Sequence, residues 1–383
     1  MLDLPTVAPR LCAIPLSSKE ADAAMPEFVD WSSARDLEQV YHRAGEVLET
    51  GGWVAFPTES GHAVAARADR PEALAAIPEE SGVWSLALAE AANLADWVGD
   101  LSPVARRLAR RSWPGPVCFE FAAPARTESA AQLHELVRLR VGGPAVLALR
   151  RPAHDAILDV LATCGAPLVL GEPPTPNSEW LASLGDAVTL VLEDGPPKYS
   201  QPATRARITG GSWTIQSAGV YTEADLRSLT ACVVLFVCTG NTCRSPMAEA
   251  LFKKILADRL GCRIEELTQR GWWVTSAGVA AALGEPAAPE AQHAVAALGA
   301  DLTNHRSRAL RVDLASTADY LVAMTRGHML SLQSGFADLG AEPRLLGDND
   351  LEDPLGHDQS VYDDCARAIH ANLQRLAAEV IPS

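Results

Sequence analysis

The stretch "CVVLFVCTGNTCRSPM", residues 232–247, decides the fold of the second half of the chain. Its first seven residues are all apolar, which is typical of a central strand in a parallel sheet. A short polar loop follows, and "SPMAEALFKKILADRL" (245–260) then has a helical pattern, with Ser245 as the predicted N-cap and Pro246 in the first turn. A strand, a tight loop and a helix in this order predict a ligand site at the carboxyl end of the strand.

The remainder of this half alternates in the same way. Strands are predicted at 272–278, 319–325 and 342–348, and helices at 288–300 and 361–381. This alternation predicts an α/β fold, a doubly wound parallel sheet over residues 229–383. Residues 1–228 form a separate unit, with strands predicted at 51–60, 82–89, 187–195 and 211–219 and a helix at 153–165. Their pattern fits an α/β or α+β domain.

Charge and composition limit the classes of function. The 383 residues carry a formal net charge of −16, divided as −10 over 1–228 (19 Lys/Arg against 29 Asp/Glu) and −6 over 229–383 (13 against 19). This balance disfavours binding to nucleic acid or to an anionic membrane. We expect no membrane span and no signal peptide. The eight cysteines are scattered without metal-ligand spacing, so we expect a cytoplasmic protein without a metal or cofactor.

Four arginines in "VARRLARRSW" stand at helical spacing, namely Arg106, Arg107, Arg110 and Arg111. We interpret them as a solvated helix face, and an anion-binding edge is the alternative.

The loop after the strand 232–238 combines a cysteine and an arginine within one turn of chain. In order, its residues are Cys238, Thr239, Gly240, Asn241, Thr242, Cys243, Arg244 and Ser245. Gly240 allows an unusual backbone turn, and Asn241 tolerates left-handed geometry. Such a loop at a helix N-terminus can direct its N–H groups at a phosphate, and Arg244 can bind two phosphate oxygens.

These donors and the positive potential favour the thiolate form of Cys238, which makes Cys238 the predicted nucleophile. Ser245 can donate to the sulfur when the sulfur leaves. The alternative is that both cysteines are structural and that Arg244 forms a surface ion pair. The agreement of strand, turn and helix start favours the catalytic interpretation.

From about residue 231 to the end, the chain resembles the low-molecular-weight protein tyrosine phosphatases. "CTGNTCRSP" is similar to their signature loop, and "TSAGV" (275–279) and "ADYLVAMT" (318–325) are similar to their strands. The resemblance implies a general acid in an Asp-Pro motif, which "DLEDPLGHD" (350–358) supplies as Asp353. By composition alone this segment is one acidic loop among several carboxylates. The resemblance selects Asp353, and the implied substrate is a phosphorylated protein.

Two positions bear on the substrate. Thr242 stands where the tyrosine phosphatases of the family typically have isoleucine, and the loop is closer to the bacterial protein-arginine phosphatases of the same fold. Leu355 and Gly356 follow the Asp-Pro motif, where an aromatic wall is common. Both features favour phosphoarginine, and phosphotyrosine is the alternative. Family members use a pair such as Cys238 and Cys243 as a protective disulfide, and a packed structural Cys243 is an equal alternative.

Residues 35–225 faintly resemble the YrdC-like threonylcarbamoyl-AMP synthases. The matching segments are "AGEVLETGGWVAFPTES" (44–60), "SWPGPVCFEF" (112–121), "LRRPAH" (149–154) and "GSWTIQSAGVYTEADL" (211–226). The family's Lys-x-Arg-Pro, which holds ATP phosphates, is replaced by "PEESGVWS" (78–85), which has no basic residue. We therefore expect a degenerate domain that has lost synthase activity and that binds a small ligand or a partner, pairs subunits, or recruits substrate.

Other functions stay open at this point. One alternative is a bifunctional protein in which the first half is an active threonylcarbamoyl-AMP synthase. Another is a scaffold protein whose first half senses a ligand and whose second half responds as a phosphatase. Arsenate reduction by the same loop is also possible in principle, but it usually requires further redox cysteines, and none is obviously placed.

Overall fold

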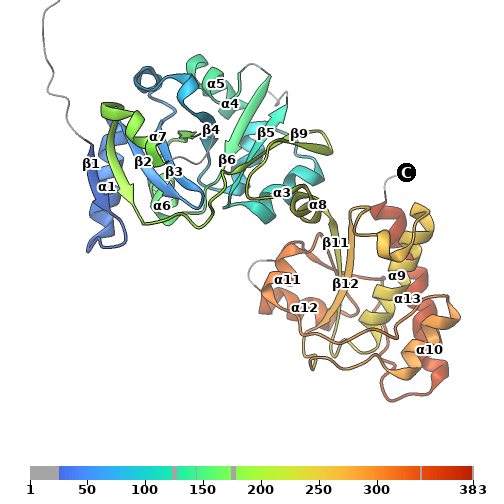
Figure 1. Cartoon of the computed structure of the whole chain (residues 1–383). Coiled ribbons are helices and arrows are strands. Elements are labelled where there is room, and N and C mark those ends of the chain that lie inside the picture. Colours follow the sequence, from blue (N-terminus) through green and yellow to red (C-terminus); the bar gives the residue numbers. More distant parts are fainter. Residues whose placement is uncertain (1–25, 123–126, 144, 174–177, 337–338, 382–383) are drawn as a thin grey trace, which may run out of the picture.

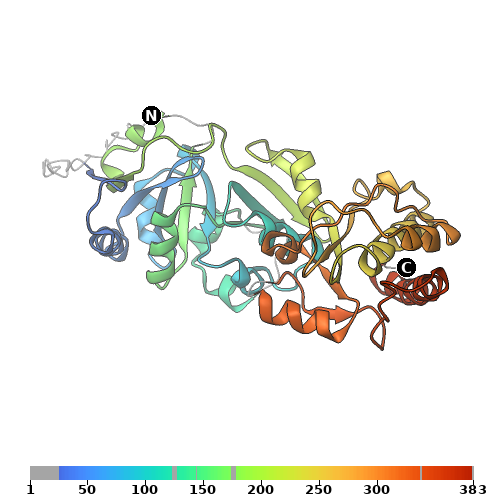
Figure 2. The same ribbon diagram turned by 90° about the horizontal axis from the view of Figure 1, so that it is seen from below.

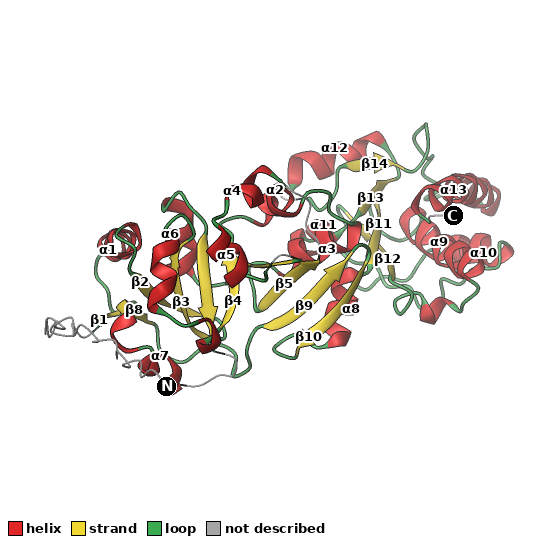
Figure 3. Ribbon diagram, turned by 90° about the horizontal axis from the view of Figure 1, so that it is seen from above, coloured by secondary structure: helices red, strands yellow, loops and turns green. Residues whose placement is uncertain are grey.

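The computed structural model describes residues 26–122, 127–143, 145–173, 178–336 and 339–381. Two sheets lie one after the other along the molecule, a large one built from the first half and a small one built from the second (Figures 1 and 2). Figure 3 shows the helices gathered around each sheet separately. Within the described ranges, no helix has the length and apolar character that a membrane crossing requires.

The large sheet has ten strands in the order β1-β8-β2-β3-β7-β4-β6-β5-β9-β10. Parallel and antiparallel pairs are mixed; for example, β2 is parallel to β8 and antiparallel to β3. The strands are β1 (Glu27–Asp30), β2 (Trp53–Thr58), β3 (Gly61–Arg67), β4 (Val83–Ala87), β5 (Val117–Ala122), β6 (Val146–Arg150), β7 (Leu168–Glu172), β8 (Val188–Glu193), β9 (Thr204–Thr209) and β10 (Ser212–Ser217).

Helices cover both faces of the central strands. In β2, Trp53 and Ala55 belong to one buried cluster, whereas Val54 and Phe56 belong to another, so both faces of the strand are buried. The helices of this half are α1 (Leu37–Glu49), α2 (Leu94–Val98), α3 (Pro103–Ser112), α4 (Glu128–Gln132), α5 (Glu135–Arg140), α6 (Asp155–Thr163), α7 (Ser178–Ser183) and α8 (Glu223–Thr230).

The predicted elements of this half are all present, as β2, β4, β8, β10 and α6. Six further strands were not predicted, among them β3 and β7, whose apolar runs include helix-favouring Ala and Leu residues. The sheet thus confirms an α/β fold whose topology the sequence pattern left open.

The small sheet has four parallel strands in the order β12-β11-β13-β14. They are β11 (Cys232–Cys238), β12 (Trp272–Gly278), β13 (Tyr320–Ala323) and β14 (Pro343–Leu345). Helices α9 (Arg244–Leu260), α10 (Pro289–Ala297) and α13 (Gln359–Val380) lie on one side, and α11 (Val312–Thr317) and α12 (Arg326–Gly335) lie on the other (Figure 1). This arrangement confirms the doubly wound parallel sheet.

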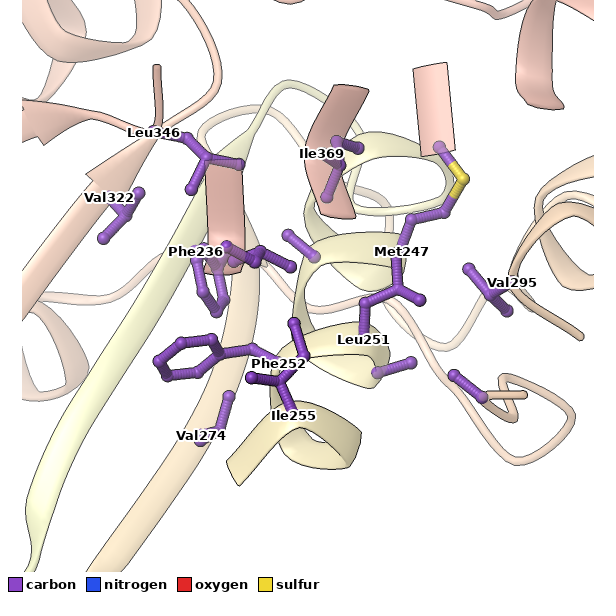
Figure 4. Packing of buried hydrophobic residues seen from close by; sticks show 14 of the residues in the cluster. Phe236, Met247, Leu251, Phe252, Ile255, Val274, Val295, Val322, Leu346 and Ile369 are labelled. Carbon is purple, nitrogen blue, oxygen red and sulfur yellow. The ribbon is translucent and has the colours of Figure 1, made fainter. Parts of the chain in front are cut away.

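The core on the α9 side holds this helix firmly against the sheet. Figure 4 shows Phe236 of β11 and Phe252 of α9 together, and their ring centroids lie 5.6 Å apart in an edge-on arrangement. Met247 and Leu251 of α9 are fully buried in the same cluster. Because this packing fixes α9, its N-terminus has a defined position at the end of β11.

The two halves meet without an intervening loop, because α8 ends at Thr230 and β11 begins at Cys232. The predicted solvated face of α3 is wrong for two of its arginines. Arg107 and Arg111 are 17% and 6% exposed and form ion pairs with Asp319, which directly precedes β13. The predicted division after residue 228 lies inside α8 and stays a prediction.

These contacts lie at the N-terminal edge of the small sheet. The loop that follows Cys238 lies at its opposite, carboxyl-terminal edge.

Candidate active site

The loop 239–243 joins the last residue of β11 to the first residue of α9. Cys238 and Arg244 are 3% and 5% exposed, so the packed core holds both ends of the loop. The Cys238 sulfur lies 3.0 Å from the Ser245 hydroxyl oxygen and accepts a hydrogen bond of 3.3 Å from the backbone N–H of Asn241. Among the described residues, the N–H groups of Gly240, Thr242 and Cys243 have no hydrogen-bond acceptor. A loop with free amides between a strand end and a helix N-terminus can receive an anion.

Asn241 holds the loop in shape. It is fully buried and adopts the left-handed conformation, with φ of 55°, as the sequence predicts. Its side-chain amide donates to Ser245 Oγ and Ser276 Oγ, each at 2.9 Å, and its Oδ1 accepts from the backbone N–H of Arg308. The buried carboxylate of Glu249 accepts from Ser276 at 2.6 Å. Each of these side chains therefore has a hydrogen-bond partner, which stabilises one loop geometry.

Two expectations for the loop are wrong. Gly240 does not have positive φ, and a methyl group added there would make only an ordinary contact of 3.6 Å with Thr242 Oγ1. The close approach belongs instead to Gly278 at the end of β12, where a Cβ would lie 2.4 Å from the carbonyl oxygen of Thr239. Ser245 is not the N-cap, because α9 begins at Arg244 and the Ser245 hydroxyl faces the sulfur of Cys238.

Asp353 lies beside the cradle formed by the loop. Its carboxylate pairs with the Arg244 guanidinium, whose other nitrogen donates to the carbonyl oxygen of Leu351 at 3.2 Å. The Asp353 side chain is 48% exposed, so it borders both the buried arginine and solvent. The neighbouring acids Asp348 and Asp350 pair with Arg375 and Arg326 instead. Tertiary structure thus singles out Asp353 from its acidic surroundings.

The other candidate residues differ in what they contact. The carbonyl oxygen of Thr242 accepts from the N–H of Ala288 at 3.0 Å. The Cys243 sulfur is buried, 3.5 Å from the Tyr362 hydroxyl, and burial raises the pKa of this thiol. Leu355 is 66% exposed at the rim, and its N–H donates to Asp353 Oδ1 at 3.3 Å. The described residues contain no cluster of three or more metal-ligating side chains.

Four residues that support the loop were not predicted from the sequence: Ser276, Glu249, His305 and His328. His305 lies 2.8 Å from the carbonyl oxygen of Asn241, and burial lowers its pKa. His328 lies 2.9 Å from the Thr239 hydroxyl oxygen. Ser276 belongs to the quoted "TSAGV" segment and could have been found there, but the histidines follow no local pattern that links them to the loop.

The first half has a buried charge cluster near the end of β2. Arg150 is fully buried between Glu59, whose carboxylate oxygen lies at 2.9 Å, and Glu172, and it also donates to Ser60 Oγ at 3.2 Å. A hollow of about 250 Å³ borders Glu59, and its other polar side chains are Thr58, His62, His154, Asp194 and Lys198.

The segment 78–85 does have basic neighbours in space, Arg140 and Arg205. The guanidinium of Arg140 lies over the Trp84 ring and donates to two backbone carbonyls. Arg205 pairs with Glu120. Both charges are therefore already engaged within the domain.

A buried cysteine at the end of a strand, free amides, an arginine and an adjacent aspartate are the groups that cysteine-dependent phosphatase chemistry requires. The family model described as "Low molecular weight phosphotyrosine protein phosphatase" matches residues 233–382. The second half of the chain belongs to this family, and the enzymes of the family are hydrolases. A second family model, described as "Telomere recombination" and named after Sua5, YciO and YrdC, matches residues 46–219 and confirms the resemblance of the first half.

The similar proteins with assigned names include both kinds of phosphatase. A protein-arginine-phosphatase of Bacillus subtilis is 37% identical over 155 residues, covering 38% of this chain and 95% of that protein. A low molecular weight phosphotyrosine protein phosphatase of Gallus gallus is 32% identical over 156 residues, covering 37% of this chain and 94% of that protein. The solved low molecular weight protein tyrosine phosphatase from T. tengcongensis is 34% identical, with a TM-score of 0.35, and covers 39% of this chain and 100% of that chain.

Proposed function

We propose that the second half of the chain removes phosphate from phosphorylated proteins through a phosphocysteine at Cys238, and that it prefers phosphoarginine. The observation that carries this proposal is the grouping of the Cys238 sulfur, the free loop amides, Arg244 and Asp353 around one cradle. A cytoplasmic location and the absence of a cofactor belong to the same proposal.

In the first step, the Cys238 thiolate attacks phosphorus and a sulfur–phosphorus bond forms. The bond from phosphorus to the leaving nitrogen of arginine, or to the oxygen of tyrosine, breaks, and protonated Asp353 gives its proton to that atom. Arg244 and the loop amides hold the three remaining phosphate oxygens. A bound phosphate competes with the Asp353 carboxylate for the Arg244 guanidinium and so frees Asp353 for this role.

In the second step, water attacks the phosphocysteine and gives a proton to Asp353. The sulfur–phosphorus bond breaks, inorganic phosphate leaves, and the thiolate returns. Ser245, 3.0 Å from the sulfur, donates its hydroxyl proton in a hydrogen bond that stabilises the departing thiolate.

The preference for phosphoarginine rests on Thr242 and Leu355. Thr242 is half-buried in the loop and offers a hydroxyl to a guanidinium group, whereas isoleucine would offer only an apolar wall for a phenyl ring. Tyr362 is the aromatic residue nearest in the sequence to the acid loop, residues 350–358. It is 2% exposed and contacts the Cys243 sulfur, so it cannot form a wall for a substrate ring. The rival substrate is phosphotyrosine, which the family description and several relatives support.

The direct test compares hydrolysis of phosphoarginine and phosphotyrosine in otherwise identical peptides by the full chain. We expect a higher kcat/KM for phosphoarginine. A preference for phosphotyrosine would contradict the substrate assignment but would leave the cysteine mechanism intact.

Replacing Thr242 by isoleucine tests the origin of that preference. The change removes a polar contact and adds an apolar one, so the ratio of kcat/KM for phosphoarginine over phosphotyrosine should fall by about tenfold to a hundredfold. Thr303→Val, on the exposed surface, is the matched control. If Thr242→Ile changes both substrates equally, discrimination lies with Leu355 or the acid loop.

For the first half, we propose a YrdC-like domain without synthase activity that binds a small ligand or a partner. Arg140 and Arg205, the basic side chains beside 78–85, are engaged by backbone carbonyls and by Glu120, so no free cationic pair is available there for ATP phosphates. Incubation with ATP, threonine and bicarbonate should yield no threonylcarbamoyl-AMP. Product above the level of a reaction without threonine would make the protein bifunctional.

A further inference from the structure

The residue next to the nucleophile is tied to an element that the mechanism does not use. The Thr239 hydroxyl oxygen lies 2.9 Å from Nε2 of His328. His328 belongs to the first turn of α12, the helix that follows β13. The carbonyl oxygen of Thr239 accepts from the N–H of Ala280 at 3.0 Å, after the end of β12. Thr239 is thus held from two directions.

His328 is itself fixed in one orientation. Its Nδ1 lies 2.9 Å from the hydroxyl oxygen of Thr325, the N-cap of α12, and the same oxygen accepts from the His328 backbone N–H. The residue is only 6% exposed. Burial and the nearby Arg244 charge lower the pKa of His328, which favours a neutral ring at neutral pH. Because both hydroxyls can donate or accept, either neutral tautomer keeps both contacts.

The segment that leads from β13 into α12 also borders the acid loop, residues 350–358. The backbone N–H of Leu351 donates to the carbonyl oxygen of Met324, and the carbonyl oxygen of Leu351 accepts from Arg244. The ion pair of Arg326 with Asp350 adds a further link, but both side chains are about half exposed, so we assign it little energy. His328 is therefore the buried side chain of this turn that contacts the nucleophile loop.

We propose that His328 is a positioning residue for the phosphatase reaction, which holds Thr239 and thereby keeps the Cys238 loop in register with the acid loop. The expected effect of His328 on turnover rests on the proposed function. The expected effect of His328 on the reactivity of Cys238 rests on the structure alone. Its physical basis is that a small misplacement of reacting groups lowers the rate strongly, while binding of the substrate changes less.

The test compares His328→Leu with His328→Gln, because the glutamine amide can replace Nε2 but cannot titrate. We expect His328→Leu to lower kcat about tenfold to a hundredfold with little change in KM, and His328→Gln to recover most of the loss. Thr239→Val should lower kcat similarly, and the double variant should be no worse than either single variant. His293→Leu, an exposed histidine of α10, is the matched control.

A second readout does not depend on turnover. Alkylation of Cys238 by iodoacetate, followed by mass spectrometry, should slow about tenfold in His328→Leu and not in His293→Leu, with unchanged circular dichroism. If wild type lacks phosphatase activity, the proposed function fails, while alkylation still decides the role of His328. The inference would be overturned if Cys238 in His328→Leu is alkylated at the wild-type rate. It would also be overturned if the fold-loss of kcat in the double variant equals the product of the losses in the two single variants.

Discussion

Arg150 and Arg244 are both buried, but their surroundings differ. Arg150 is fully buried between two carboxylates, Glu59 and Glu172, of which Glu172 is the last residue of β7. Arg244 pairs with one carboxylate, Asp353, which is half-exposed on a loop. The charge of Arg150 is therefore neutralised within the fold, whereas the proposed mechanism requires Arg244 to exchange Asp353 for a phosphate. A buried arginine indicates a binding site only where its partner can leave.

The largest expected effect comes from replacing Cys238, the proposed nucleophile beside Arg244. Cys238→Ser should reduce turnover to a trace, because a hydroxyl does not ionise near neutral pH as a thiol can. Steady-state hydrolysis of a phosphopeptide measures the loss. Cys262→Ser, a partly exposed free cysteine outside the loop, should behave as wild type. Substantial turnover by Cys238→Ser would refute the phosphocysteine mechanism.

The second test removes the charge of Asp353, the carboxylate that pairs with Arg244. Asp353→Asn should lower kcat by roughly 10²–10⁴, the usual effect of removing a general acid. The adjacent exposed Glu352→Gln is the control and should have little effect. If Asp353→Asn keeps the wild-type rate, the proton comes from another group and the pair with Arg244 is structural, as it is for Arg150.

The third test concerns the first half. Arg150→Met leaves the buried Glu59 and the largely buried Glu172 without a counter-charge, which should cost this half about 3–5 kcal/mol of unfolding free energy. Seven of the nine tryptophans lie before residue 229, so fluorescence during urea unfolding reports mainly on this half. Phosphatase kcat under native conditions should not change.

A charge-free control separates charge from packing in that experiment. Adding Glu59→Gln and Glu172→Gln to Arg150→Met should recover part of the lost stability, since no unpaired charge remains. If Arg150→Met unfolds at the same urea concentration as wild type, the cluster contributes nothing to the fold and the comparison of the two arginines fails.

The sequence was informative wherever function depends on neighbours along the chain. The strand 232–238, the loop and the following helix were predicted within a residue or two, because their periodicity and turn residues are local. The predicted N-cap Ser245 and the predicted role of Gly240 were wrong for a related reason. Side-chain contacts with Cys238 and the approach of β12 decide those positions, and neither is visible in local pattern.

The arginines of α3 were also misjudged because their partner is distant in the sequence. Their helical spacing predicted a solvated face, but Asp319, more than 200 residues later, lies against Arg111. Likewise, only the fold places His328 beside Thr239, 89 positions away, and Ser276 beside Asn241. Hydrogen bonds between distant segments produce no periodic pattern in the sequence, so they cannot be predicted from it.

By itself, the sequence predicted the loop that follows β11, Cys238 as the proposed nucleophile, Arg244 beside it, and the alternation of strands and helices around them. These features depend on residues within one turn or one strand, where backbone geometry and side-chain type suffice. Tertiary structure decided which acid reaches Arg244, which side chains hold the loop, and that Arg150 lies between two carboxylates while Arg244 pairs with one half-exposed carboxylate. Those outcomes depend on packing that brings separate elements within hydrogen-bond distance, and the free energy of such contacts exists only in the folded chain.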